Sequence, residues 1–163
     1  VDLEGETIGL LYKIYPWEWL ISDEFGSFLS EESMAVVEPA WKAVVSSKGI
    51  LPILWELFPN HPNLLPAFFS SEKAGGNYVR KPLWSREGAN VEVVTREGTF
   101  STDGTYGKEG YVYQQYFQLP EFDGMHPTLG TWMIGHEAAG MGIREDASPV
   151  VKRTSVFVPH YFV

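Results

Sequence analysis

Short apolar runs, each closed by glycine or proline, are the feature that most constrains how this chain can fold. Runs 78–83 and 90–95 are separated by a turn at 86–88, and a second glycine turn follows at 96–98. Runs of this length that are rich in Val, Thr and Tyr are typical of antiparallel hairpins. Later runs of the same kind lie at 111–119, 129–136 and 138–144. We therefore predict a mainly antiparallel sheet over about residues 77–159.

The first third of the chain carries helix signals instead. A short strand is expected at 7–15, because Pro16 ends that apolar run. Pro39 can occupy the first position of a helix, where no backbone N–H donor is needed, and Pro52 can open a second helix in the same way. Pro59 would end the second helix. These signals predict short helices over about residues 39–58 and one domain of the α+β class.

Charge and composition exclude several classes of protein. The chain has 12 Lys and Arg against 21 Asp and Glu, and its net charge of −9 repels nucleic acids and anionic membranes. The absence of Cys excludes disulfides, thiolate catalysis and sulfur-ligated zinc, and makes a reducing cytoplasm the expected location. No apolar run approaches the ~20 residues that a membrane helix requires. We expect neither nucleic acid nor membrane as a partner.

Three further patterns give weak functional signals. His136 and Glu137 begin like the zinc-protease motif, but Gly140 stands where the second His is required. The glycines between residues 104 and 110 lack the spacing and the strand-then-helix setting of a dinucleotide site. The six Trp and eight Tyr could stack on sugars, but rings within apolar runs more often fill a core. We predict no metal site in this chain and rank carbohydrate binding last.

Basic residues are scarce, so Lys48, Lys81, Arg86 and Arg144 need an explanation. Lys81 lies inside an apolar strand, and a Lys in that setting is rarely buried without a partner. A salt bridge or exposure on one face of the sheet would explain it without a ligand. The alternative is an anion site, in which several strands bring cations to one phosphate chain. The pattern by itself leaves both explanations open.

Several long blocks of the sequence resemble one family of enzymes. They are residues 11–20 (LYKIYPWEWL), 38–42 (EPAWK), 47–65, 78–90 (YVRKPLWSREGAN) and 113–123 (YQQYFQLPEFD). In this order they resemble glutathionylspermidine synthase proteins and their shorter bacterial relatives, the acid–amine ligases. The resemblance implies an ATP-grasp fold that holds ATP between antiparallel sheets. It also implies that ATP and Mg²⁺ convert a peptide-like acid to an acyl phosphate, which a small amine attacks to form an amide.

The resemblance further implies roles for individual residues. Lys48 and Lys81 match the family's nucleotide-binding lysines, and the turn 85–88 matches its phosphate loop. Residues 114–117 match the hinge that contacts adenine. Arg144 matches a late arginine at the phosphate end, where it would stabilise charge during phosphoryl transfer and act as a catalytic residue. The implied nucleotide-binding residues are Lys48, Lys81, Arg86, Gly88, Gln114, Gln115, Tyr116, Phe117 and Thr128.

One part of the family's machinery has no match in this chain. The family's Mg²⁺ ligands and a catalytic arginine lie upstream of the matched blocks, so residues 1–163 are expected to be the carboxyl-terminal part of a ligase domain. The ending 155–163 is expected to lie close to a natural terminus. Because phosphoryl transfer needs the metal, the chain alone should be inactive or nearly so. The alternative is a non-catalytic binding module: convergence of Lys48, Lys81 and Arg144 would favour the ligase, and scattered cations the module.

Overall fold

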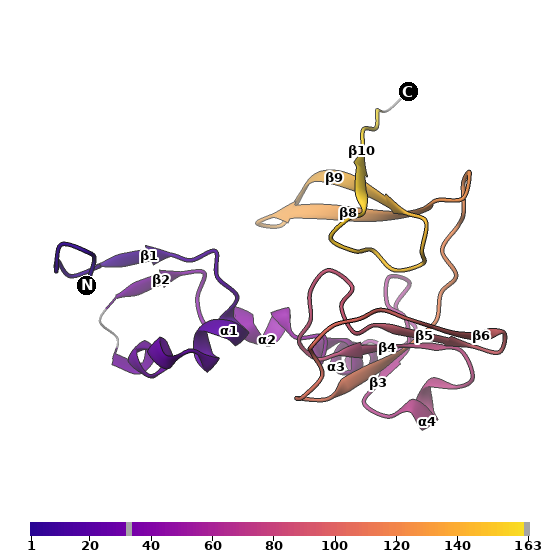
Figure 1. Cartoon of the computed structure of the whole chain (residues 1–163), viewed down its shortest axis with the longest axis horizontal. Helices are drawn as coiled ribbons and strands as arrows, with labels where there is room; N and C mark the ends of the chain where they lie inside the picture. The colour runs from indigo at the N-terminus through magenta and orange to yellow at the C-terminus, as the bar shows by residue number, and fades with distance from the viewer. Residues whose placement is uncertain (32–33, 162–163) are drawn as a thin grey trace.

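The computed structural model describes residues 1–31 and 34–161 and consists of an amino-terminal arm and two antiparallel sheets (Figure 1). The last two residues of the ending 155–163 lie outside this description. In the arm, β1 (Leu10–Tyr12) pairs in parallel with β2 (Ala35–Val37). Beside them lie α1 (Trp17–Ser22) and the 3-10 helix η1 (Glu24–Glu31). The strand predicted at 7–15 is thus present as a three-residue strand.

Short helices connect the arm to the sheets. They are α2 (Lys42–Ser46) and α3 (Ile50–Leu57), and α4 (Ser71–Ala74) follows later. Pro39 precedes α2, and its carbonyl accepts a hydrogen bond from the Lys42 backbone N–H. Pro52 is the third residue of α3, and the fold tolerates it there because N–H groups in a first helical turn have no intrahelical acceptor.

A five-stranded antiparallel sheet forms the body of the structure. Its strand order is β3-β7-β4-β5-β6, so β7 inserts between β3 and β4. Val91 and Val93 form a buried cluster with Val150, which lies between strands β9 and β10 of the second sheet. The strands are β3 (Ala67–Phe68), β4 (Tyr78–Pro82), β5 (Glu92–Thr95), β6 (Gly98–Ser101) and β7 (Tyr111–Gln115).

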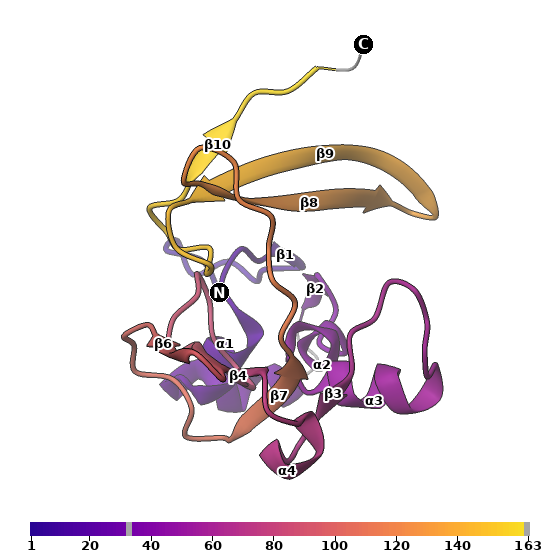
Figure 2. The same ribbon diagram turned by 90° about the vertical axis from the view of Figure 1, so that its right-hand side faces the viewer.

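The second sheet has three strands, in the order β10-β9-β8. They are β8 (His126–Ile134), β9 (Glu137–Asp146) and β10 (Val156–Val158), and the long β8–β9 hairpin lies apart from the five-stranded sheet (Figure 2). Trp132 and Ile134 near its tip are largely exposed. The loop 147–155 runs from β9 to β10, and its residue Val150 packs into the five-stranded sheet. This loop therefore connects the two sheets.

The structure confirms an α+β fold with antiparallel sheets, and it differs from the sequence expectation in two respects. The strands predicted as one sheet form two separate sheets, and β3 lies before the predicted start of the sheet. No helix within residues 1–31 and 34–161 is both long enough and apolar enough to cross a bilayer.

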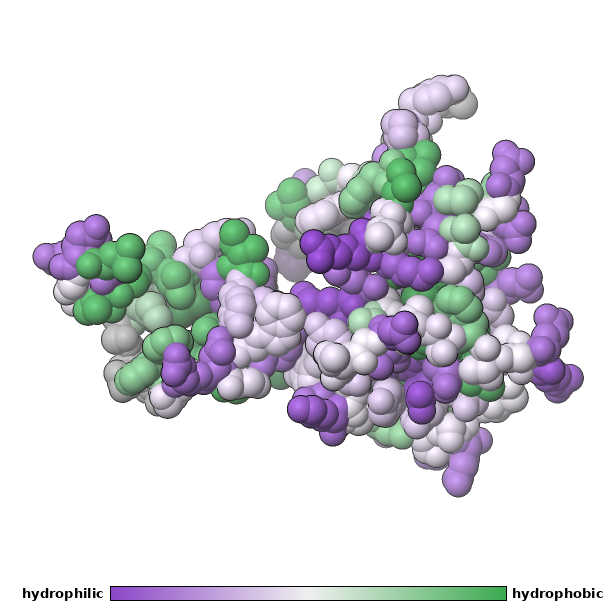
Figure 3. Space-filling view, viewed as in Figure 1, coloured by the Kyte–Doolittle hydropathy of each residue, from purple (hydrophilic) through white to green (hydrophobic). Residues whose placement is uncertain are grey.

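Hydrophobic side chains gather on the arm and near β10, as Figure 3 shows in green.

Candidate functional site

Lys81 lies on the central strand β4 and is largely removed from water. Its Nζ donates a hydrogen bond of 2.7 Å to Oε1 of Gln114 on the neighbouring strand β7. Burial, together with the positive charge of Lys48, lowers the pKa of Lys81 to about 8. Within the described residues Lys81 forms no ion pair with a carboxylate. The salt-bridge explanation considered from the sequence is therefore wrong for Lys81.

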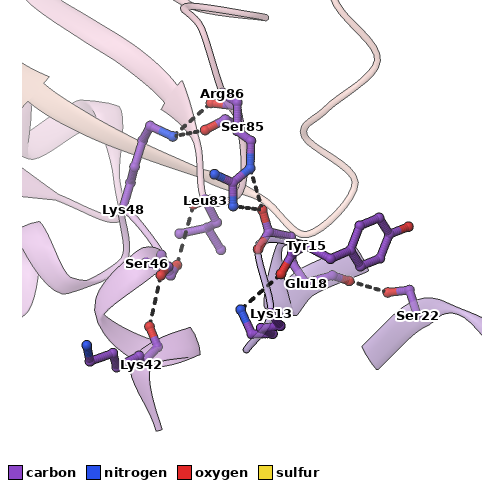
Figure 4. A network of polar contacts seen from close by, with 11 residues as sticks. Lys13, Tyr15, Glu18, Ser22, Lys42, Ser46, Lys48, Leu83, Ser85 and Arg86 are labelled. Carbon is purple, nitrogen blue, oxygen red and sulfur yellow. Dashed lines mark hydrogen bonds and ion pairs between the residues drawn. The ribbon is translucent and has the colours of Figure 1, made fainter. Parts of the chain in front are cut away.

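Lys48 follows α2 and reaches the turn after β4. Its Nζ donates to the carbonyl oxygen and to Oγ of Ser85, both at 2.8 Å (Figure 4). Burial is the main cause that lowers the pKa of Lys48, and the charge of Arg86 adds to this, while Glu18 opposes it. Like Lys81, Lys48 makes no ion pair among the residues that the structure describes. Neither lysine is therefore neutralised by an ion pair with a carboxylate of the described residues.

Both lysines line one cavity of about 350 Å³. Residues 114–117, at the end of β7, line it as well. The rest of the wall is apolar, and no Asp or Glu among the described residues lines the cavity. The apolar wall comes from Leu65, Val79, Val91, Val93, Leu119, Pro149, Val150 and Val151. The cavity combines positive charge with an apolar wall, which suits a ligand with an anionic end and a flat apolar end.

The wall formed by residues 149–151 is a part of this site that sequence reasoning missed. These residues lie in the loop after β9, and Val150 is only 9% exposed because it packs against Val91 and Val93. An apolar loop residue carries no chemical signature of binding. The one sequence signal for this wall was the pair Val150 and Val151, because loops usually carry polar residues.

The turn 85–88 is shaped by Gly88 and packed against this loop. Glu87 and Gly88 both have positive φ, 53° and 71°. A Cβ added at Gly88 would collide with the Val151 carbonyl oxygen and would lie 2.7 Å from a Val150 methyl carbon. The Gly88 carbonyl accepts a hydrogen bond of 2.5 Å from the Thr102 hydroxyl. Glycine is therefore required here for both backbone conformation and space.

Arg86 does not line the cavity of the two lysines. Its Nη2 and Nε donate to Glu18 Oε1 on α1, at 2.8 and 3.2 Å, and its guanidinium lies 6.0 Å from the ring centre of Trp19. Arg86 and Gly88 instead line a larger, neighbouring cavity of about 760 Å³. Arg86 and Gly88 thus lie outside the lysine cavity, and the ion pair of Arg86 with Glu18 connects the turn to the arm.

Thr128 and Arg144 lie directly opposite each other on β8 and β9, outside the lysine cavity. Arg144 Nη2 donates to the carbonyl oxygens of Lys152 (2.6 Å) and Ser155 (3.4 Å), and its guanidinium lies 5.1 Å from the ring centre of Phe157. These contacts hold the loop 147–155, whose valines form the cavity wall. Of the three cations whose convergence would favour the ligase, Lys48 and Lys81 line one cavity. Arg144 lies outside this cavity and holds the loop beside it.

Asp146 holds the same loop from the end of β9. Its carboxylate accepts hydrogen bonds of 2.7 Å from the hydroxyls of Ser155 and Ser148 and lies 3.7 Å from Lys152 Nζ. These contacts, with the Ser155 hydroxyl foremost, lower the pKa of Asp146 to about 2. The described residues contain no group of three or more His, Asp or Glu that could hold a metal ion.

Comparison with known proteins identifies the family. Residues 1–163 match the family described as glutathionylspermidine synthase preATP-grasp. The chain belongs to the glutathionylspermidine synthase family. It is 46% identical over 173 residues to a Haemophilus influenzae protein whose name assigns it provisionally as an acid–amine ligase. That alignment covers 100% of this chain and 44% of the relative.

More distant relatives carry more specific names. The chain is 31% identical over 183 residues to the trypanothione synthetase of Crithidia fasciculata, covering 96% of this chain and 28% of that protein. It is also 31% identical over 186 residues to the bifunctional glutathionylspermidine synthetase/amidase of Escherichia coli, covering 98% and 30%. By name these relatives of the family are ligases. The chain spans less than half of the length of each of them.

Proposed function

We propose that residues 1–163 are the carboxyl-terminal, nucleotide-binding part of an ATP-grasp ligase domain that joins a carboxylic acid to an amine. One observation carries this proposal: Lys48 and Lys81 share a mostly apolar cavity, and neither has a carboxylate partner among the described residues. Burial and the positive charge of Lys48 lower the pKa of Lys81, and burial and the charge of Arg86 lower that of Lys48. A chain of phosphates would supply the missing anions, so the cavity fits ATP better than a neutral ligand.

The parts of the cavity suggest how the nucleotide would lie. Lys48 and Lys81 would neutralise phosphate oxygens, and residues 114–117 would orient the base through backbone groups at the end of β7. The valines of the loop 147–155 would cover the base. Arg144 and Thr128 are proposed to act at the phosphate end, and in this chain Arg144 holds the loop through Lys152 and Ser155.

The metal and the rest of the reaction are proposed to need the remainder of a longer protein. No carboxylate within residues 1–31 and 34–161 lines the lysine cavity, so the ligands of Mg²⁺ are proposed to come from other parts of a longer protein. The phosphoryl group that activates the acid would come from ATP, and this chain would bind and neutralise it. From the names of the relatives, the acid is proposed to be peptide-like and the second substrate a small amine. The chain alone is proposed to bind ATP without turnover.

Titration calorimetry with ATP, with and without Mg²⁺, tests this function. The folded chain should bind ATP, and Lys81→Ala should abolish binding, because it removes a phosphate ligand from the cavity. Lys73→Ala is the matched control, since Lys73 is exposed on α4 and should leave binding unchanged. A folded chain that does not bind ATP, or equal affinity in Lys81→Ala, would contradict the proposal.

A further inference from the structure

The two strands of the arm have one covered face and one face open to solvent. Successive side chains of a strand point to opposite faces, and β1 and β2 both follow an exposed, half-buried, exposed pattern. The half-buried residues Leu11 and Val36 are paired in the register, and Val36 lines a cavity together with Trp17 and Ile21 of α1. The opposite face, which we call the bare face, carries Leu10, Tyr12, Ile14, Ala35 and Val37.

The bare face is apolar although it is exposed. Leu10 is 63% exposed and Ile14 is 91% exposed, and the apolar side chains of the arm are prominent in green in Figure 3. The pairing of β1 with β2 is parallel, and parallel strands in proteins are almost always covered on both faces, usually by helices. Two strands by themselves are also only marginally stable in water. Both arguments indicate that a further element packs on the bare face.

The charge of the arm indicates the chemistry of that element. Residues 1–38 contain nine Asp and Glu against one Lys, whereas residues 39–163 contain 12 acidic and 11 basic residues. Nearly the whole net charge of −9 therefore lies in the arm. Three of the acidic residues precede β1 and are exposed, namely Asp2, Glu4 and Glu6. An apolar segment with basic flanks would complement this surface.

A second copy of this chain fits the bare face poorly. In a two-fold dimer the same patch meets itself, so two acidic arms would face each other and repel. The rest of a longer protein fits better, because the alignment with the Haemophilus influenzae relative covers 100% of this chain but only 44% of that protein. More than half of the relative is thus available to supply a covering element.

We propose that the bare face is a docking surface for an apolar helix with basic flanks, and that this helix belongs to the rest of a longer ligase of this family. A helix is the element that usually covers parallel strands. This inference rests on the proposed function only in requiring the longer protein. It does not require that the lysine cavity bind ATP, so either proposal can fail without the other.

Labelling of single thiols tests the docking surface. Because the chain has no Cys, Leu10→Cys places a unique thiol on the bare face. Leu57→Cys at the end of α3 is the matched control, since both leucines are 63% exposed. Each variant is prepared as residues 1–163 alone and as a chimera in which residues 1–163 replace the matched segment of the Haemophilus influenzae relative. Peptide mass spectrometry then gives the rate at which each thiol reacts with a maleimide.

The two thiols should react at similar rates in residues 1–163 alone. In the chimera, the thiol of Leu10→Cys should react more slowly by about tenfold or more, because a docked thiol reacts only when the interface opens. The thiol of Leu57→Cys should react at an unchanged rate. Equal rates for the two thiols in a folded chimera would overturn the docking surface.

A zero-length carbodiimide cross-linker identifies the occupant in the same chimera, because it joins a carboxylate to a lysine only where the two are in contact. Cross-links should connect Asp2, Glu4 or Glu6 with lysines outside the 163 grafted residues. Cross-links confined to the grafted residues would refute a basic partner from the rest of the ligase. Loss of Leu10→Cys reactivity with rising concentration of residues 1–163 alone would place a second copy on the bare face and overturn the proposed partner.

A second measurement decides the question if the chimera does not fold. In the unmodified Haemophilus influenzae relative, the segment aligned with residues 9–14 should exchange its amide hydrogens about tenfold more slowly than the same segment of residues 1–163 alone. Equal exchange would overturn the inference. ATP binding, measured separately on residues 1–163, decides the nucleotide proposal whichever of these results is obtained.

Discussion

Replacing Lys81 with Met tests whether the lysine serves a ligand rather than the fold. Met has a similar length and no charge, so it can remain in the cavity without disturbing its shape. The structure lowers the pKa of Lys81 from the ordinary value of 10.5 to about 8. At about 1.4 kcal/mol for each pH unit, this difference means that the buried charge destabilises the fold by about 3 kcal/mol at pH 7.

The expected net gain is smaller, because Met cannot replace the hydrogen bond to Gln114. Losing that bond should cost about 1 kcal/mol, so Lys81→Met should raise the free energy of unfolding by about 2 kcal/mol at pH 7. Between pH 8 and 10.5, the Lys81 amine is mostly protonated in the unfolded wild-type chain and mostly neutral in the folded chain. Wild-type stability therefore rises with pH in this range, and the advantage of the variant should shrink.

Urea denaturation at pH 7 and at pH 9.5, followed by Trp fluorescence, measures both effects. Lys73→Met is the matched control, because Lys73 is exposed and its replacement should change stability little at either pH. A Lys81→Met chain that is less stable than wild type at pH 7 would show that Lys81 supports the fold. If the free energy of unfolding of Lys81→Met exceeded that of wild type by the same amount at both pH values, the buried charge would not be the cause of the difference.

Two further substitutions test how the loop 147–155 is held. Gly88→Ala should lower the free energy of unfolding by about 1–3 kcal/mol, because its Cβ would collide with Val151; Gly9→Ala, with no atom within 4 Å, is the control in the same urea assay. Asp146→Asn should be less stable than wild type at pH 7, because the ionised carboxylate accepts the Ser155 and Ser148 hydroxyls. The carboxylate is stabilising above its ordinary pKa of 3.8 and this contribution is lost as pH falls toward about 2, so the difference between Asp146→Asn and wild type should narrow at pH 3.

The local elements of the fold were predictable, and the pairing between distant ones was not. The pairing of β4 with β5 follows from the glycine turn 86–88 between two strand-like runs, a signal that is local in the sequence. The insertion of β7 between β3 and β4, and the separation of β8–β10 into a second sheet, depend on contacts between distant segments. Alternation of side chains predicts that a strand exists but does not name its partner.

The contrast between local signals and distant contacts also explains which site residues the sequence placed correctly in the lysine cavity and which it did not. Lys48, Lys81 and residues 114–117 belong to sequence blocks that resemble the family, and the structure gathers them in one cavity. Arg86 belongs to such a block too, but it pairs with Glu18, a residue 68 positions away, which no local pattern could indicate. Arg144 and Thr128 lie on the second sheet because the chain leaves the first sheet after β7.

The insertion of β7 also sets an order in which the chain can fold as it is synthesised. Strands β4, β5 and β6 are consecutive and can pair as soon as they emerge, but β3 must wait for β7 because β7 is its neighbour in the sheet. The valines that cover the cavity are translated later still. Until residue 151 has emerged from the ribosome, Lys81 would remain in contact with water and keep an ordinary lysine's charge. Desolvation of that charge is therefore among the last steps of folding, when most of the sheet is already in place to offset it.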